Sequence, residues 1–186
     1  MASEENESLR GRLLIAGPTL LDPNFARTVL LMAEHGDEGA MGVVLNRPAT
    51  ITVSEAVPDL VELAGADEPV YVGGPVQRQA VIVLAEFDDP EIAGELILGD
   101  IGFAGAGSDF DELAGAVRRA RIFAGCAGWA PGQLEAELER DDWIVGDVAP
   151  DDLFAAGAEE LWGTVLRRMG GNYALIATMP VDPSVN

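Results

Sequence analysis

The sequence predicts a single α+β domain, and three observations support this fold class. Strand-like apolar runs dominate the first half of the chain, whereas helical patterns dominate the second half. The two kinds of segment do not alternate regularly, as they would in a doubly wound parallel fold. With 186 residues, of which 48% are apolar, the chain is long enough to bury a hydrophobic core.

A β-hairpin is expected in the first quarter of the chain. "RTVLLMAEH" is a β-branched and aliphatic run, "GDEG" is a turn, and "AMGVVLN" resumes a strand, so residues 27–46 are predicted to pair with each other. The run "GRLLIAG" at 11–17 predicts a strand before the hairpin. Further strands are expected at 68–76, where the chain reaches a Gly-Gly-Pro corner, and at 80–87 and 94–100.

Helices are expected mainly in the second half. Residues 54–65 predict only a weak helix, because Pro58 interrupts it. Asp109 and Glu112 have the spacing of a capping box and predict a helix over 109–120. The other expected segments are a helix from Pro131 to 141, an amphipathic helix over 158–171 closed by Gly170, short strands at 121–126 and 143–148, and a flexible glycine-rich loop at 102–110.

The two ends of the chain are polar or turn-rich and show no periodicity. We expect a disordered acidic tail at 1–9, one domain over 10–180 and a C-terminal tail at 181–186. No apolar stretch reaches the roughly 18 to 20 residues that a membrane span needs, and the acidic N-terminus is unlike a secretion signal. A cytoplasmic location is therefore expected, and a single cysteine, Cys126, fits a reducing compartment.

The charge of the chain bears on its partners. There are 32 acidic residues against 11 basic ones, all arginine, and the net charge is −21. Nucleic-acid affinity comes from cations that contact phosphates, and the clustered cations here are only Arg118, Arg119 and Arg121, just before an apolar segment. Direct nucleic-acid binding is therefore disfavoured, although an acid-rich proteome gives the same bias without functional meaning.

No metal or cofactor is predicted. One histidine and one cysteine cannot supply a zinc site, and the carboxylates lack the spacing of a calcium-binding loop. Gly102, Gly105 and Gly107 do not match the spacing of a dinucleotide-binding loop. The phosphate-binding loop that ends in lysine is also missing, since the chain contains no lysine.

An enzymatic alternative rests on Cys126. The residue follows a short apolar strand, has small neighbours and precedes a helix, which is a setting that can expose a nucleophile. His35 is the only histidine and hence the candidate base, so the pair predicts a cysteine-dependent hydrolase or amide transferase. The opposing interpretation is that Cys126 is a buried packing residue and His35 a structural one.

Four stretches together resemble the YqgE/AlgH family of bacterial proteins. They are "LLDPNFARTV" (20–29), "EHGDEGAMGVVLNRP" (34–48), "VYVGGPV" (70–76) and "AGWAPGQLEAE" (127–137), and the likeness covers nearly the whole folded region. The resemblance implies a compact single domain with a mixed, bifurcated β-sheet that includes a small barrel and is surrounded by helices. It implies no established reaction, and one branch of the family carries the name of a transcriptional regulator of alginate synthesis.

If the four stretches meet in space, they line a ligand site. Arg27, Arg47 and Arg78 then converge on a carboxylate or phosphate, or else each pairs with a nearby acid and stabilises a turn. Trp129 either forms a wall beside the following helix N-terminus or packs in the core. The candidate ligand-binding residues are Arg27, His35, Asn46, Arg47, Gly73, Gly74, Trp129 and Gln133.

The sequence thus predicts a non-catalytic binding or regulatory protein. The expected partner is a small anionic molecule, a peptide or a protein, and any effect on transcription is expected to be indirect.

Overall fold

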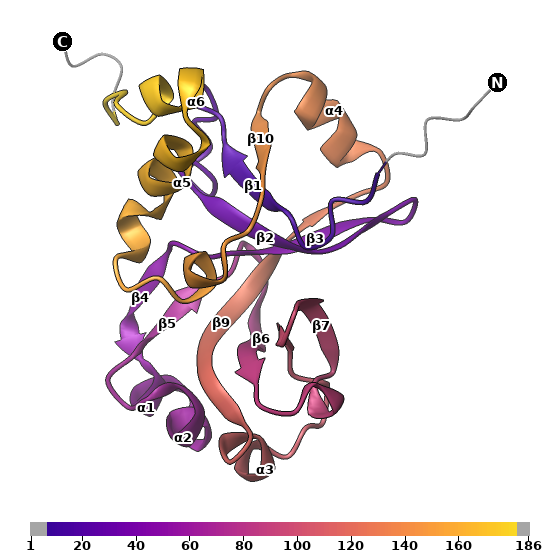
Figure 1. Ribbon diagram of the computed structural model, residues 1–186, viewed down its shortest axis with the longest axis vertical. Helices are drawn as coiled ribbons and strands as arrows, with labels where there is room; N and C mark the ends of the chain where they lie inside the picture. The colour runs from indigo at the N-terminus through magenta and orange to yellow at the C-terminus, as the bar shows by residue number, and fades with distance from the viewer. Residues whose placement is uncertain (1–6, 182–186) are drawn as a thin grey trace.

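The computed structural model describes residues 7–181, in which strands form one branched sheet and helices pack around it (Figure 1). The strands are β1 (Leu13–Ala16), β2 (Val29–Gly36), β3 (Gly39–Val44), β4 (Pro48–Thr52), β5 (Pro69–Val72), β6 (Val76–Phe87), β7 (Glu95–Leu98), β8 (Ile101–Phe103), β9 (Val117–Trp129) and β10 (Trp143–Gly146). The helices are α1 (Val53–Ala56), α2 (Val61–Ala64), α3 (Phe110–Ala114), α4 (Gln133–Glu139), α5 (Leu161–Met169) and α6 (Gly171–Ile176). Short 3-10 turns are η1 (Pro58–Leu60), η2 (Pro90–Ile92), η3 (Pro150–Phe154) and η4 (Ala158–Glu160).

The sheet branches at its longest strand, β9. The main order is β10-β1-β2-β3-β9-β6-β8-β7, and β4 and β5 join from the side, where β5 pairs with β9. The β5–β9 pairing is parallel, whereas the other pairings of the described strands are antiparallel. The α+β class is confirmed and the sheet is bifurcated, but these pairings do not close into a ring, so the small barrel is not confirmed.

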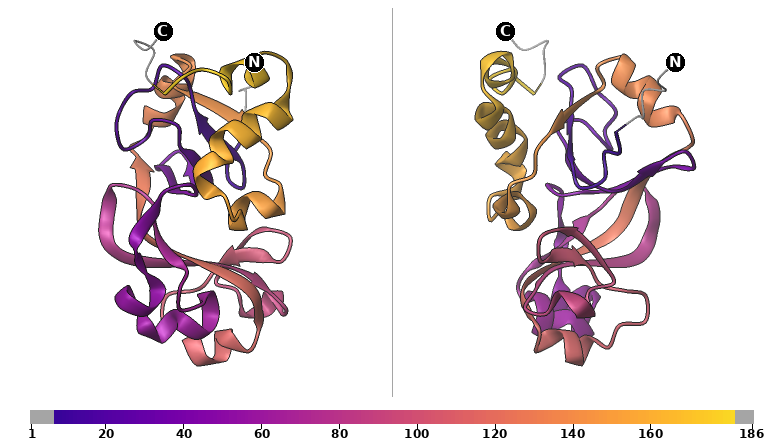
Figure 2. Two further views of the ribbon diagram at one scale, coloured as in Figure 1. Left: turned by 90° about the vertical axis from the view of Figure 1, so that its left-hand side faces the viewer. Right: turned by 45° about the vertical axis from the view of Figure 1, so that its right-hand side comes forward.

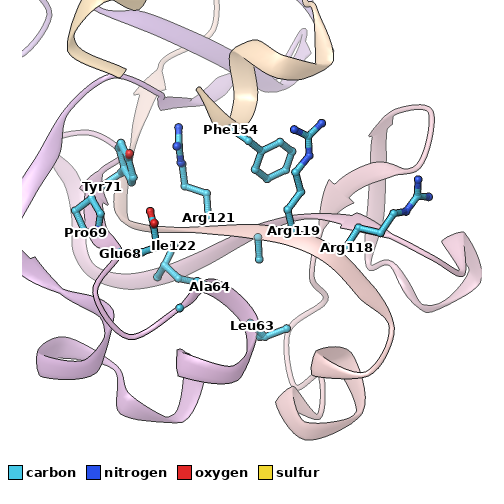
Figure 3. A pocket seen from close by; sticks show the side chains of 12 residues that line it. Leu63, Ala64, Glu68, Pro69, Tyr71, Arg118, Arg119, Arg121, Ile122 and Phe154 are labelled. Carbon is cyan, nitrogen blue, oxygen red and sulfur yellow. The ribbon is translucent and has the colours of Figure 1, made fainter. Parts of the chain in front are cut away.

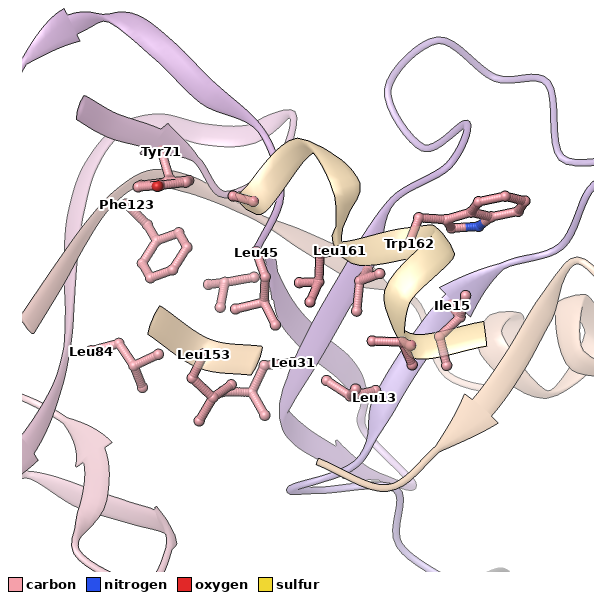
Figure 4. Close-up of a cluster of buried hydrophobic side chains, with 14 of the residues drawn as sticks. Leu13, Ile15, Leu31, Leu45, Tyr71, Leu84, Phe123, Leu153, Leu161 and Trp162 are labelled. Carbon is pink, nitrogen blue, oxygen red and sulfur yellow. The ribbon is translucent and has the colours of Figure 1, made fainter. Parts of the chain in front are cut away.

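Strands β1 and β2 are covered on both faces. Leu13 and Ile15 face a core that includes Trp162 of α5, and Figure 4 shows these side chains together. Leu14 faces a second core with Leu134 of α4. Accordingly, α5 and α6 lie on one side of β1 and β2 and α4 lies on the other (Figures 1 and 2). This double cover explains why the sequence of β1 is continuously apolar instead of alternating.

A third core lies at the opposite end of the molecule, where α1, α2 and α3 cover one face of β6 and β9 (Figure 1). Val83 and Ile122 of the two strands pack there with Leu63 of α2. The expected weak helix is divided as predicted at Pro58, which opens η1 between α1 and α2.

Several expected boundaries were wrong for identifiable reasons. Asp109 does cap a helix through the N–H groups of Asp111 and Glu112, but α3 ends at Ala114 because residues from Val117 onward pair with β6. The expected short strand at 121–126 is therefore part of the much longer β9. Tertiary pairing overrides the local helical pattern in this segment.

Other segments also differ from the expectation. Gly132 has a φ of 75°, so α4 begins at Gln133 and not at Pro131. The first residues of the expected loop at 102–110 belong to β8, which pairs with β6. The short elements β4 and α6 were not expected, because a run opened by Pro48 and a segment opened by two glycines lack the usual signals.

The predicted N-terminal tail is partly anchored. Ser8 Oγ donates to the carbonyl of His35 at 3.1 Å, and Leu9 packs against the second core. The remainder of the predicted tails, at 1–6 and 182–186, lies outside the described residues. Within residues 7–181, no helix is long and apolar enough to cross a membrane.

Candidate functional site

Asn46 fixes the start of β2 and the loop before it. Its Oδ1 accepts the Val29 N–H at 2.9 Å, and its Nδ2 donates to the Arg27 carbonyl at 2.9 Å. Asn46 is buried, and it satisfies the buried Val29 N–H and the partly buried Arg27 carbonyl. Arg27 is held with a φ of 56°, a left-handed conformation that is uncommon for a residue other than glycine.

The side chain of Arg27 connects this loop to the C-terminal part of the chain. Its guanidinium lies 4.5 Å from the ring centroid of Trp162, and its Nη2 donates to the carbonyl of Met179. Trp162 is itself fixed, because its Nε1 donates to the Ala16 carbonyl at 2.8 Å. The Arg27 guanidinium thus contacts an aromatic ring and a carbonyl oxygen. Neither group carries the negative charge that would neutralise it.

Arg47 lies on the other side of the same loop. Its Nη1 and Nη2 donate to the carbonyls of Pro23 and Ala26, at 3.2 and 2.7 Å. Arg78 is exposed on β6 and has no hydrogen bond or ion pair with another described residue. The alternative in which each of these arginines pairs with a nearby acid is therefore not seen in the described part of the chain.

Two hollows adjoin at Arg47, and together we call them the arginine groove. The larger has a volume of about 490 Å³ and the smaller about 190 Å³. Arg27 lines the larger one, Arg78 the smaller one, and Arg47 both. The larger hollow is otherwise mainly apolar, with Pro18, Leu20, Leu21, Trp162, Met179 and Val181 among its lining residues.

Gly73 and Gly74 bring backbone close to backbone beside the groove. The Gly73 carbonyl accepts from Val44 and its N–H donates to Ala124, at 2.8 and 2.9 Å. A Cβ atom on Gly74 would overlap the Cys126 carbonyl, so only glycine fits there. Both glycines stabilise the corner, and Gly74 also lines the smaller hollow.

His35, Trp129 and Gln133 form a separate group beside α4. His35 Nδ1 accepts the Leu9 N–H at 2.9 Å, so we assign the proton to Nε2, which lies 2.9 Å from Glu135 Oε1. The histidine therefore connects the N-terminal segment, β2 and α4. The hollow lined by His35 shares no residue with the two hollows lined by the arginines, so the structure divides the predicted residues into two groups.

Beside α4, the polar groups of Trp129 and Gln133 are bonded to a carboxylate of the chain itself. The Glu137 carboxylate accepts from Trp129 Nε1 at 2.8 Å and from Gln133 Nε2 at 3.0 Å. It also accepts from Trp143 Nε1 at 2.8 Å. Trp129 is buried and packs edge-on against Trp143, so its alternative role as a core residue is the one that the structure supports.

Cys126 and His35 are not brought together. Cys126 is buried opposite Val76 in the sheet, and burial raises the pKa of its thiol. His35 pairs with Ala40, and Ala40 pairs with Trp129, three residues along β9 from Cys126. That offset alone is about 10 Å along the strand, with two strand spacings added across the sheet. The geometry does not support the nucleophile–base pair.

A second cluster of arginines lines a cleft that the sequence did not reveal as a site. Arg118, Arg119 and Arg121 lie on β9 and line a cleft of about 460 Å³. The signal was present as three arginines within four residues, but a helical interpretation of 109–120 obscured it. In a strand, Arg119 and Arg121 project to the same face. No cluster of three or more potential metal-binding side chains occurs in the described part of the chain.

The comparisons with known proteins agree with the resemblance seen in the sequence. A family model described as AlgH-like matches residues 13–174. A UPF0301 protein of Streptomyces coelicolor is 43% identical over 98% of this chain and 97% of its own length, and one of Mycobacterium tuberculosis is 42% identical over 95% and 90%.

Two solved structures are also similar. The crystal structure of a Corynebacterium diphtheriae protein, DIP2367, has a TM-score of 0.83 and 31% identity, and the match covers 95% of both chains. The solution structure of the AlgH protein from Pseudomonas aeruginosa has a TM-score of 0.70 and 32% identity, with 97% of this chain and 98% of that chain covered.

Proposed function

We propose that this protein, which belongs to the AlgH-like family, is a non-catalytic binding protein whose arginine groove takes a small acidic molecule. One observation carries the proposal. Six of the eleven arginines form ion pairs with carboxylates, but Arg27, Arg47 and Arg78 do not pair with any described carboxylate. In a chain with a net charge of −21, three uncompensated cations along one groove favour an acidic ligand.

The hydrogen-bonding capacity of Arg47 supports this assignment. A guanidinium has five N–H groups, and the two carbonyl bonds of Arg47 leave donors available for an acceptor in either hollow. Because those bonds also fix the side chain, little further entropy is lost when a ligand binds. A carboxylate or phosphate matches the planar fork of the guanidinium, and a charge-assisted hydrogen bond contributes about 1.5–3 kcal/mol.

The larger hollow indicates the rest of the ligand. Its volume of about 490 Å³ is within the usual range for small-molecule sites. Leu21, Met179 and Val181 line it and expose much of their apolar surface. A molecule with an acidic head and an apolar body therefore complements the groove better than a bare anion does.

If the protein regulates transcription, we propose that its ligand-bound form is recognised by another protein and that it does not itself bind DNA. The groove is bounded by the loop before β2 and by residues 179–181, so a ligand would join two segments that are distant in sequence. A partner protein could then distinguish the bound from the free form. The net charge of −21 opposes direct binding to nucleic-acid phosphates, and we propose a cytoplasmic, indirect role.

The proposal is tested by thermal unfolding with a panel of acids. Octanoate, benzoate and phenyl phosphate carry a head and a body, acetate and inorganic phosphate lack the body, and 1-octanol lacks the acid. A ligand at 100 times its Kd adds about 2.7 kcal/mol of stability, which is about 5–11 °C in Tm for a chain of this size. We expect such a shift only for molecules that have both parts.

Charge-removing variants locate the site. Arg47→Gln should abolish the shift, and Arg78→Gln should weaken it without affecting folding, because Arg78 makes no bond to a described residue. Arg167→Gln is the matched control, since Arg167 carries the same charge and lies on α5 outside the groove. Equal shifts in all three variants, or none with any acid in the panel, would refute the proposal.

A further inference from the structure

The cleft beside Arg121 is a second concave site, distinct from the arginine groove (Figure 3). It lies where β9 passes between the α2–β5 connection and η3, and its volume is about 460 Å³. We call it the Arg121 cleft. Its lining includes Leu63, Glu68, Tyr71, Arg119, Arg121, Ile122 and Phe154, and it shares no residue with the arginine groove.

Arg121 has an unsatisfied donor at this cleft. The residue is only 7% exposed, its Nη2 donates to the Ala155 carbonyl at 2.9 Å, and its guanidinium lies 4.1 Å from the Tyr71 ring centroid. Its Nη1 is buried and has no hydrogen-bond partner among the described residues. Burial lowers the pKa of Arg121, and the nearby Tyr71 and Glu68 offset this effect only in part.

An unpaired buried donor of this kind is uncommon in proteins and calls for an acceptor. Arg121 also lines the cleft, so an acceptor that enters the cleft reaches its guanidinium. The neighbouring arginine does not compete, because Arg119 Nε is paired with Glu86 Oε2 at 2.7 Å.

Arg118 does not compete either. It is paired with three carboxylates, those of Glu86, Asp88 and Asp100. Of the three arginines in the cleft, only Arg121 lacks a carboxylate partner among the described residues, and it is also the most buried.

Glu68 supplies the opposite charge in the same cleft. Its backbone is fixed, because its carbonyl accepts the Val53 N–H at 2.8 Å. Its side-chain carboxylate is exposed and makes no hydrogen bond or ion pair with a described residue. Figure 3 shows this carboxylate directed toward the part of the cleft where Tyr71 and Arg121 lie, and its field acts on the pKa of both.

From these contacts we infer that the Arg121 cleft binds a small zwitterion, with a carboxylate on Arg121 and an ammonium group on Glu68, which is the charge pattern of a free amino acid. A simple anion would satisfy Arg121 but would approach the uncompensated Glu68 carboxylate. A simple amine would pair with Glu68 but would approach the positive charge of Arg121. A zwitterion pairs with both charges, and Leu63, Ile122 and Phe154 provide apolar surface for a side chain.

The experiment uses the full-length protein and each of the twenty common amino acids as probes, with Kd measured by calorimetry. The best binder is then compared with its decarboxylated amine and its deaminated acid. We expect the amino acid to bind at least about tenfold more tightly than either, because losing one ion pair of about 1.4 kcal/mol corresponds to that factor. Equal binding of the deaminated acid, or no binding of any amino acid, overturns the inference.

Variants identify the two charges. Glu68→Gln should weaken amino-acid binding about tenfold and leave the deaminated acid bound as well as before or better. Glu62→Gln, an equal charge change at an exposed site on α2 outside the cleft, is the control and should bind normally. Arg121→Lys should weaken both the amino acid and the deaminated acid.

Because Glu68 is exposed, its variant tests the inference even if Arg121→Lys fails to fold. An unchanged affinity in Glu68→Gln would refute it. Arg47→Gln should leave amino-acid binding intact, so failure of this inference and failure of the proposed function are distinguishable.

Discussion

Replacing Asn46 by alanine should destabilise the protein strongly and loosen the arginine groove. The change removes the acceptor of the buried Val29 N–H and the donor to the Arg27 carbonyl. Each hydrogen bond contributes about 1 kcal/mol net, and each backbone group left unsatisfied costs about 1–3 kcal/mol. Because relaxation recovers part of this, we expect a loss of about 2–4 kcal/mol in the free energy of unfolding.

Urea denaturation followed by tryptophan fluorescence measures this loss, and calorimetry should show Tm falling by about 4–16 °C for a chain of this size. Asn172→Ala is the matched control, because Asn172 is exposed on α6, and its effect should stay within about 0.5 kcal/mol. If Asn46→Ala is as mild as the control, the two hydrogen bonds do not anchor the loop and the reasoning fails.

The variant Asn46→Asp separates the two bonds. A carboxylate still accepts the Val29 N–H but opposes the Arg27 carbonyl, and burial raises its pKa. The protonated acid can donate to that carbonyl. The deficit relative to wild type should therefore be present at neutral pH and shrink as the pH falls through the raised pKa. A deficit that does not change with pH would contradict this account.

Three further outcomes are expected. Gly74→Ala should cost more than about 3 kcal/mol in the free energy of unfolding, because the added Cβ overlaps the Cys126 carbonyl. Gly36→Ala is the control: no atom lies within 4 Å of its added Cβ, so it should change stability by less than about 1 kcal/mol. Urea denaturation compares the two variants. Native Cys126 should react far more slowly with iodoacetamide than it does in urea, because burial raises the pKa of the thiol, and rapid labelling of the folded protein would contradict its burial. A hydrogen bond from its own backbone amide and one from His35 lower the pKa of Glu135 in the folded protein. The stabilisation of the fold by the Glu135 carboxylate should therefore be complete above the unfolded pKa and be lost as the pH falls through the lower folded pKa. Because solvent screens this partly exposed pair, Glu135→Gln should remove no more than about 1 kcal/mol of the difference in stability between pH 7 and pH 3, and a larger change would show that the pair is more strongly coupled.

Local sequence patterns predicted much of the secondary structure. The hairpin of β2 and β3, the break at Pro58 and the helix end at Gly170 all follow from short-range rules. The N-terminal half of β9 does not, because its arginine-rich sequence has a helical pattern and becomes a strand only by pairing with β6. Local sequence rules cannot predict where a strand begins when its pairing with a distant strand decides that boundary.

For the candidate sites, too, the sequence identified residues but not the contacts that they make. The sequence singled out Arg27, Arg47 and Arg78, but not the fact that the first two donate to carbonyls and that Arg78 has no partner among the described residues. It also grouped Trp129 with them, although that residue ends β9 beside α4 and bonds to the Glu137 carboxylate of α4. Partner choice depends on which side chains the sheet brings within hydrogen-bonding distance.

The sequence by itself determined the α+β class, the family resemblance, the acidic surface and the residues of the four motif stretches, because these depend on composition, short-range order and periodicity. Only the tertiary structure decided which charges are compensated. It left Arg47 lining two hollows, and it buried Arg121 in the cleft of Glu68 with one donor that no described residue accepts. Ion pairing depends on distances of a few ångströms between residues far apart in the chain, and those distances are set by the branching of the sheet at β9.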